Sequence, residues 1–281
     1  MVTPFTDDGS AVSEARLRAY CDFLIGSGIS GLFAFGTTGE WTLLTEAERA
    51  AGARVLAQQA RGRVPVIVHA GAHATEQAVR LAMGAREAGA DAVSLISPPF
   101  FPLDDAALFD HFTTVARAVA GFPVFLYNIP EFAGNDLSPA LLLRVAKQAD
   151  NVIGLKYSGD SLNRFREYRR TMGSDFSLFN GNDSLALPAL HEGADGLVSG
   201  NASARPDLLA ALYALFRDGR YREAADKQRE LDDFINARDS SCELSSFKAM
   251  LAHRGVQVGD VRPPLKRLSA EGRAALRRHL P

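Results

Sequence analysis

A single lysine, Lys156, stands near the end of the apolar run Val152–Leu155 and is followed by the turn residues Ser158–Asp160. This pattern predicts a buried strand that carries one amine at its carboxyl end. Burial disfavours a charged side chain, and a neutral lysine amine attacks ketones and aldehydes to form Schiff bases. The alternative is a structural lysine paired with a carboxylate. The rest of the sequence has to decide between the two interpretations.

A second candidate is the segment Gly36-Thr37-Thr38-Gly39, which follows the apolar residues 31–35. Its glycines allow the backbone to bend and to approach a ligand closely. Successive backbone N–H groups, together with the hydroxyls of Thr37 and Thr38, can hold a carboxylate. The alternative is a tight strand-to-helix turn that binds nothing.

Tyr127 ends the apolar segment 124–127. A phenol beside a Schiff base can carry protons to and from the reacting oxygens, although a core tyrosine would give the same pattern. His69 and His73 have the spacing of metal ligands on a helix. Gly71 between them argues against a helix, and no third ligand is evident. We therefore expect no metal, which disfavours a metal-dependent aldolase.

The elements that position these residues alternate along the chain as strand and helix. Repeated units of this kind predict parallel strands, and no G-x-G-x-x-G sequence follows any strand as in many open doubly wound sheets. The predicted fold class is therefore α/β, a (β/α)8 TIM barrel with a C-terminal three-helix extension. The strand candidates are Gly31–Phe35, Pro65–His69, Ala92–Ile96, Val124–Tyr127, Val152–Lys156, Phe176–Asn180, Gly196–Ser199 and a short eighth segment at the start, Val2–Thr3.

We expect residues 1–218 to form the barrel with the active site, and residues 219–281 to form the helical extension, with helices over 220–238, 245–253 and 269–278. A capping box over Thr45–Glu48 opens one helix, and Ser138 is the N-cap of another. Thr75, Asp104 and Ser184 are further N-cap candidates. In a barrel the chemistry lies at the carboxyl ends of the strands, where the polar candidates fall.

Composition excludes several other classes of protein. The 281 residues include 31 basic and 33 acidic side chains, a net charge of -2, which predicts no nucleic-acid partner. No apolar stretch reaches the ~18 residues of a membrane span, and the first residues do not resemble a signal peptide. Cys21 and Cys242 form no disulfide or zinc pattern, so we expect a cytoplasmic protein.

Three ordered motifs carry a family resemblance: Gly36–Glu40, Tyr127–Pro130 and Gly154–Lys156. With them the chain resembles the dihydrodipicolinate synthase / N-acetylneuraminate lyase family from Val2 to Pro264. The resemblance implies a barrel that assembles into a homo-oligomer, a tetramer or a dimer. It also implies a Schiff base between Lys156 and pyruvate or another 2-keto acid, with no other cofactor. Tyr127 matches the proton-transfer tyrosine, Thr37 and Thr38 match the carboxylate-binding loop, and Val198 matches a residue lining the pyruvate pocket.

The sequence also departs from the family pattern. The synthase has an arginine for the aldehyde's carboxylate where this chain has Phe132, and a tyrosine that reaches a neighbouring subunit is absent from Ser97–Phe101. The segments Val68–Gly71 and Phe179–Asp183 look like those of sugar-acid lyases, and Gly181 and Asp183 are candidates for binding a polyol.

We therefore predict an aldolase that releases pyruvate from a 2-keto-3-deoxy sugar acid. The first alternative is 4-hydroxy-tetrahydrodipicolinate synthase, which condenses pyruvate with aspartate semialdehyde. A keto-deoxy-acid dehydratase and a non-catalytic pyruvate-binding barrel are the others.

Overall fold

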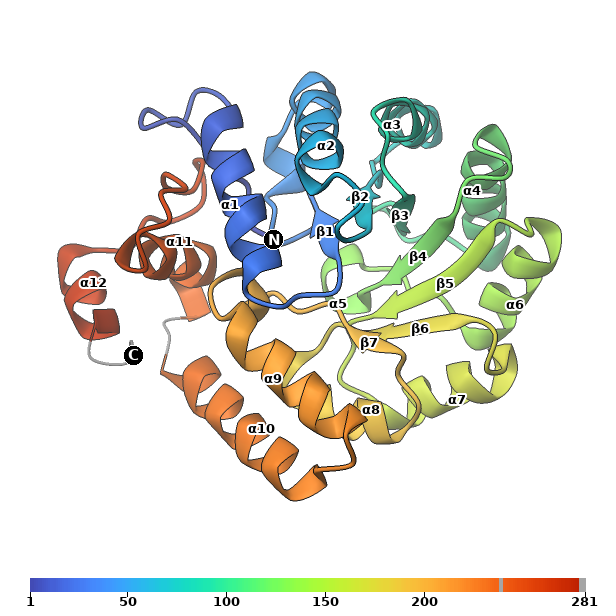
Figure 1. Ribbon diagram of the computed structural model, residues 1–281. Coiled ribbons are helices and arrows are strands. Elements are labelled where there is room, and N and C mark those ends of the chain that lie inside the picture. Colours follow the sequence, from blue (N-terminus) through green and yellow to red (C-terminus); the bar gives the residue numbers. More distant parts are fainter. Residues whose placement is uncertain (238–239, 278–281) are drawn as a thin grey trace. The chain divides into compact units, whose positions relative to one another are not determined.

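A computed structural model describes residues 1–237 and 240–277 (Figure 1). Within these residues, seven strands form one sheet, in the order in which they follow one another along the chain. The pairings from the second strand to the seventh are all parallel. The strands are β1 (Leu32–Ala34), β2 (Val66–His69), β3 (Ala92–Ile96), β4 (Val124–Asn128), β5 (Val152–Tyr157), β6 (Ser177–Asn180) and β7 (Gly196–Leu197).

Helix α1 precedes β1, and the other helices and the 3-10 turns lie between the strands or after β7. An order that never reverses is that of a barrel, whereas a doubly wound sheet reverses at its ligand crevice. The helices are α1 (Glu14–Gly26), α2 (Glu46–Ala60), α3 (Thr75–Glu87), α4 (Asp105–Ala118), α5 (Pro130–Ala133), α6 (Pro139–Gln148), α7 (Leu162–Met172), α8 (Ala186–His191), α9 (Pro206–Arg217), α10 (Tyr221–Asn236), α11 (Glu243–His253) and α12 (Ala270–Arg277), with turns η1 (Trp41–Leu43), η2 (Asp183–Leu185), η3 (Asn201–Ser203) and η4 (Ser240–Cys242).

The predicted strand at Val2–Thr3 is wrong, since neither residue belongs to a strand. Pro4 follows directly and has no N–H to donate to a ladder. The contact with β1 comes from Met1 instead, whose amine donates a hydrogen bond of 3.0 Å to the carbonyl of Phe33.

Three of the predicted helix starts are confirmed. Thr45 and Glu48 form the reciprocal capping box of α2. The Ser138 side chain accepts a hydrogen bond from the backbone N–H of Leu141 in α6, and Asp104 caps α4 in the same way. Each cap satisfies an N–H group that the first helical turn leaves without a partner.

Two predicted caps are wrong. Ala74, not Thr75, is the N-cap of α3, and the Thr75 hydroxyl lies 2.9 Å from Nδ1 of His111. Ser184 lies inside η2, where its N–H donates to the Asn182 side chain. In both places a nearby residue, Ala74 or Asn182, occupies the cap position. The residue type by itself therefore does not determine which position becomes the cap.

The chain divides into two compact units, one of Met1–Val66 with Gly200–Pro281 and one of Ile67–Ser199. The boundary expected between residues 218 and 219 stays a prediction. The three helices expected in the extension correspond to α10, α11 and α12, and α9 also follows β7. The predicted end residues Arg238 and Arg278 lie outside the described residues. None of the helices in residues 1–237 and 240–277 has the length and hydrophobicity needed to cross a membrane.

Candidate active site

The second unit contains Lys156 and Tyr127 on neighbouring strands. Every residue of β4 is buried, and the register of β4 and β5 places Tyr127 opposite Lys156. Only 8% of Lys156 is exposed, and its Nζ lies 3.8 Å from the centre of the Tyr127 ring. The predicted buried amine beside a phenol at the strand ends is therefore present. An amine held in this way has little water around it and can approach a carbonyl carbon.

His69 adds a third ring to this group. It ends β2, is fully buried, and packs edge-on against Tyr127 with 6.0 Å between ring centres. His73, four residues later, is exposed, so the two histidines do not share a site. From the sequence we considered His69 as a metal ligand and as part of a segment that looks like sugar-acid lyases, and we did not predict its place beside the phenol. Its position at the end of a strand was the available signal.

Gly181 lies directly against the amine. A Cβ atom at this position would be 2.7 Å from Cε of Lys156 and 2.0 Å from Oγ of Ser158. The Gly181 N–H donates to the carbonyl of Tyr157 at 2.8 Å, which fixes the backbone there. A side chain at this position would therefore displace the end of Lys156 and the Ser158 hydroxyl.

Asp183 and Val198 also belong to the second unit. The Asp183 carboxylate is 9% exposed and accepts a hydrogen bond of 2.7 Å from the Ser199 hydroxyl. The Val198 N–H donates to the carbonyl of Asn180, the last residue of β6, at 2.8 Å. These bonds hold a carboxylate and an apolar side chain at the ends of the last two strands.

Thr37 and Thr38 belong to the first unit and occupy the predicted turn. The Gly39 N–H donates to the Gly36 carbonyl at 2.9 Å, and the Glu40 N–H donates to the Thr37 carbonyl at 3.1 Å. Both threonine side chains are partly exposed. The turn needs glycine at position 39 because a Cβ there would lie 2.8 Å from the Phe35 Cα. The turn is confirmed, and the binding of a carboxylate stays a prediction.

The positions that depart from the family pattern are exposed in the second unit. Phe100, Phe101 and Phe132 are 84%, 68% and 65% exposed. Phe100 has a φ of 87°, which is rare for a residue with a bulky side chain. The Asn135 amide fastens this loop by donating to the carbonyls of Pro98 at 2.8 Å and Phe101 at 2.9 Å.

Potential metal ligands do not cluster in the described part of the chain, where no group of three or more His, Cys, Asp and Glu side chains could hold an ion. The chemistry available to the described side chains is that of an amine, a phenol, hydroxyls and a carboxylate. Such groups suit covalent catalysis with proton transfer.

Comparison with known proteins gives the family. The model of the Dihydrodipicolinate synthetase family matches residues 1–281. The chain belongs to this family. It is 31% identical over 280 residues to the 4-hydroxy-tetrahydrodipicolinate synthase of Methanopyrus kandleri, with 100% of this chain and 93% of the relative covered. It is 36% identical over 230 residues to an Escherichia coli protein named "Probable 2-dehydro-3-deoxy-D-pentonate aldolase YjhH", with 81% and 76% covered.

Solved structures agree with this assignment. An E. coli K12 prophage protein of the dihydrodipicolinic acid synthase family, in complex with pyruvate, matches with a TM-score of 0.93, 31% identity, and coverage of 99% of this chain and 94% of that one. A catalytic lysine mutant of Ruminococcus gnavus sialic acid aldolase matches with a TM-score of 0.95, 25% identity, and coverage of 99% and 92%. The chain is thus an α/β enzyme of the TIM-barrel class, in a family of Schiff-base lyases that make or break carbon–carbon bonds.

Proposed function

We propose that the protein is a pyruvate-dependent aldolase that forms a Schiff base through Lys156 and cleaves a 2-keto-3-deoxy sugar acid to pyruvate and an aldehyde. The observation that carries this proposal is the buried Lys156 amine on the face of the Tyr127 ring, 3.8 Å from its centre. The remaining site residues supply binding and proton transfer around that amine.

The reaction starts when the Lys156 amine adds to the C2 carbonyl of the keto acid. Loss of water from the carbinolamine gives an iminium ion, which withdraws electrons from the C3–C4 bond. The Tyr127 phenol gives its proton to the departing hydroxyl of the carbinolamine. The resulting phenolate takes the proton of the C4 hydroxyl as the C3–C4 bond breaks, so an aldehyde leaves and an enamine remains. Protonation of the enamine at C3 and hydrolysis of the iminium then release pyruvate and restore the amine.

Binding of the substrate is divided among the other candidates. Backbone N–H groups and hydroxyls of Thr37 and Thr38 receive the carboxylate. Val198 lines the side of the pyruvate portion. Gly181 leaves room beside Lys156, and Asp183 accepts hydrogen bonds from the substrate's hydroxyls.

The charge of Asp183 favours a sugar acid over aspartate semialdehyde. A buried carboxylate accepts hydrogen bonds from hydroxyl groups, whereas it repels a second carboxylate on the aldehyde portion. At the position of the synthase's arginine this chain has Phe132, which has no charge and is 65% exposed. The synthase reaction remains the second candidate because the relative from Methanopyrus kandleri carries that name.

We also propose that the enzyme is a cytoplasmic homo-oligomer, a tetramer or a dimer. The neighbouring side chains of Phe100 and Phe101 are 84% and 68% exposed and pack against each other with 5.1 Å between ring centres. Two large apolar rings in contact with water favour burial against another protein surface. Mass measurement of the purified protein in solution tests this assembly.

Borohydride trapping tests the function. Incubation with pyruvate and borohydride is expected to give a reduced adduct that peptide mapping locates on Lys156. Cleavage of keto-deoxy-gluconate, keto-deoxy-galactonate and N-acetylneuraminate is measured by coupled detection of pyruvate. Lys156→Ala is expected to remove both the adduct and this cleavage. The matched control is Lys147→Ala, on the exposed side of α6, which keeps both.

Pyruvate that labels no residue, or labels only other lysines, contradicts the proposal. Condensation of pyruvate with aspartate semialdehyde is measured in the same panel. A faster rate in that reaction than in any cleavage selects the synthase instead.

A further inference from the structure

A buried ion pair joins the Thr37–Thr38 turn to the C-terminal part of the first unit. The Glu40 carboxylate, which closes the turn, lies 2.7 Å from Nζ of Lys248 in α11, and the two side chains are 0% and 1% exposed. These residues are 208 positions apart in the sequence. An ion pair this deeply buried has almost no water to screen it, so its geometry is held tightly.

Lys248 has two further contacts that fix its position. Its Nζ donates to the Asp260 carbonyl at 2.9 Å and lies 4.2 Å from the centre of the Phe5 ring. Burial lowers the pKa of Lys248, and the charge of Glu40 opposes that change. The charge of Glu40 therefore stabilises the charged form of the Lys248 amine, and the charge of Lys248 in turn stabilises the buried Glu40 carboxylate.

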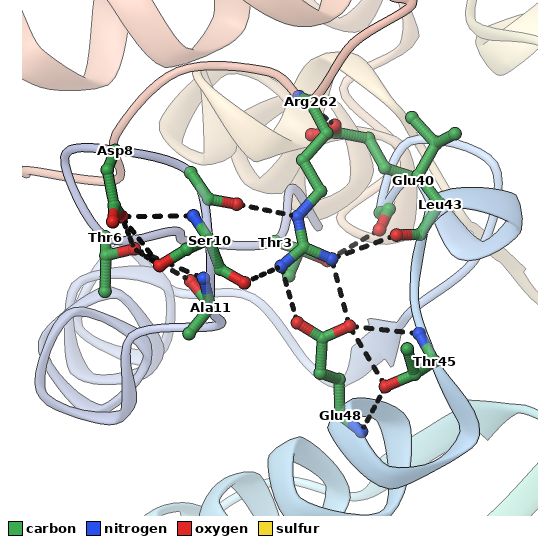
Figure 2. Close-up of polar contacts among 12 residues, drawn as sticks. Thr3, Thr6, Asp8, Ser10, Ala11, Glu40, Leu43, Thr45, Glu48 and Arg262 are labelled. Carbon is green, nitrogen blue, oxygen red and sulfur yellow. Dashed lines mark hydrogen bonds and ion pairs between the residues drawn. The ribbon is translucent and has the colours of Figure 1, made fainter.

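Arg262 binds the other carboxylate oxygen of Glu40 (Figure 2). It also contacts a segment before Glu40 in the sequence, Gly9–Ser10, and two residues after Glu40, Leu43 and Glu48. Its backbone N–H donates to Oε2 of Glu40 at 2.9 Å, and its guanidinium group makes five hydrogen bonds, one for each N–H it possesses. The acceptors are the Gly9 carbonyl at 2.9 Å, the Ser10 carbonyl at 3.0 Å, the Leu43 carbonyl at 2.9 Å, and the two Glu48 carboxylate oxygens at 2.5 and 2.9 Å.

The backbone of the turn needs these contacts. Glu40 has a φ of 59°, a left-handed conformation that residues other than glycine rarely adopt and that persists only where neighbouring groups enforce it. On the other side of the turn, the Thr3 hydroxyl donates to the Gly39 carbonyl at 2.6 Å. The turn is therefore held from outside at both of its last two residues.

Stability is a weak reason for such an arrangement, because a buried ion pair is often no more stabilising than apolar side chains of the same size. The Glu40 carboxylate, two residues after Thr38, would also repel an anionic ligand of the turn if its charge were not balanced. Lys248 balances that charge, and Arg262 fixes the direction of the carboxylate.

We infer that Glu40, Lys248 and Arg262 are positioning residues that hold Thr37 and Thr38 in the geometry that receives the keto acid's carboxylate. The C-terminal segment from α11 to Arg262 is thereby required for substrate affinity. This inference rests on the proposed function, since it assumes that the turn binds pyruvate.

The test measures the pyruvate concentration that gives half-maximal borohydride trapping on Lys156 in the full chain. Glu40→Gln and Arg262→Met are each expected to raise this concentration about tenfold, ~1.4 kcal/mol of binding free energy. Labelling at saturating pyruvate stays complete. The neutral pair Glu40→Gln/Lys248→Met keeps the packing and removes both charges, and it is expected to show the same loss of affinity.

Arg205→Met is the matched control. Arg205 is 12% exposed, as is Arg262, and it too pairs with carboxylates in the first unit, Asp207 and Glu230. These pairs join α9 to α10 and do not touch the turn. The control is expected to lower the melting temperature and to leave the half-saturating pyruvate concentration unchanged.

The outcomes separate this inference from the proposed function. Full trapping in the unmodified chain, with unchanged half-saturation in both Glu40→Gln and the neutral pair, overturns the positioning role alone. An equal rise in Arg205→Met overturns it as well, because the effect would then follow from general destabilisation. No adduct on Lys156 in the unmodified chain overturns the proposed function and this inference with it.

Discussion

At the scale of single residues, the Lys156 amine of the proposed site lies in space that Gly181 leaves free. Gly181 has no side chain, and a Cβ at that position would lie 2.7 Å from Cε of Lys156 and 2.0 Å from Oγ of Ser158. At such separations the contacting side chains must shift, so we expect an alanine to move the end of the lysine away from the face of the Tyr127 ring. A displacement of about 1 Å at a reacting group can lower a rate about 100-fold.

Gly181→Ala is therefore expected to lower kcat about 100-fold while the protein stays folded, as measured by coupled pyruvate detection and circular dichroism. Gly84→Ala serves as its control. Gly84 lies within α3 and a Cβ there meets nothing within 4 Å, so this change keeps full activity and stabilises the helix by up to about 1 kcal/mol. Unaltered kcat in Gly181→Ala would show that the lysine does not need this space.

At the scale of elements, helix α6 begins with a cap that can be tested by itself. The Ser138 side chain accepts from the N–H of Leu141 at 3.1 Å. Loss of an N-cap side chain costs about 1 kcal/mol, so Ser138→Ala is expected to reduce the free energy of unfolding in urea by that amount. Ser174→Ala removes a serine from an exposed loop and is expected to change nothing. Equal stability of both variants would show that α6 begins without help from its cap.

Elements were predictable from sequence where local pattern and burial agree. The apolar runs of β3, β4 and β5 gave their bounds to within one residue, because strands covered on both faces read as continuous hydrophobic segments. The contact between Tyr127 and Lys156 follows from the same pattern, since each lies one residue before the end of its strand and the two strands are parallel neighbours. The contacts of Arg262 could not be predicted, because its partner Gly9 lies 253 positions away and nothing local marks either residue.

At the scale of the whole molecule, stability should depend on pH through a buried histidine. His111 in α4 is 4% exposed, and its Nδ1 lies 2.9 Å from the Thr75 hydroxyl. Burial lowers the pKa of His111 from 6.5 to about 4. In the unfolded chain the imidazole binds a proton below about pH 6.5, whereas in the folded chain it stays neutral down to about pH 4. Between these values the unfolded state holds more protons, so the free energy of unfolding rises with pH.

The contribution of His111 is therefore complete above pH 6.5 and is lost as the pH falls toward 4, a change of about 3 kcal/mol at 1.36 kcal/mol for each unit of pKa. Urea unfolding at intervals from pH 4.5 to 7.5 measures it. His111→Gln keeps a polar group beside Thr75 but cannot be protonated in this range, so its stability should vary less with pH across that window. Hydrogen bonds from Arg262 lower the pKa of Glu48, and hydrogen bonds and charge from Arg254 and Arg205 lower the pKa of Asp207, but both carboxylates are present in both proteins. Parallel curves for the two proteins would contradict the assignment, because the common carboxylates would then account for the whole dependence.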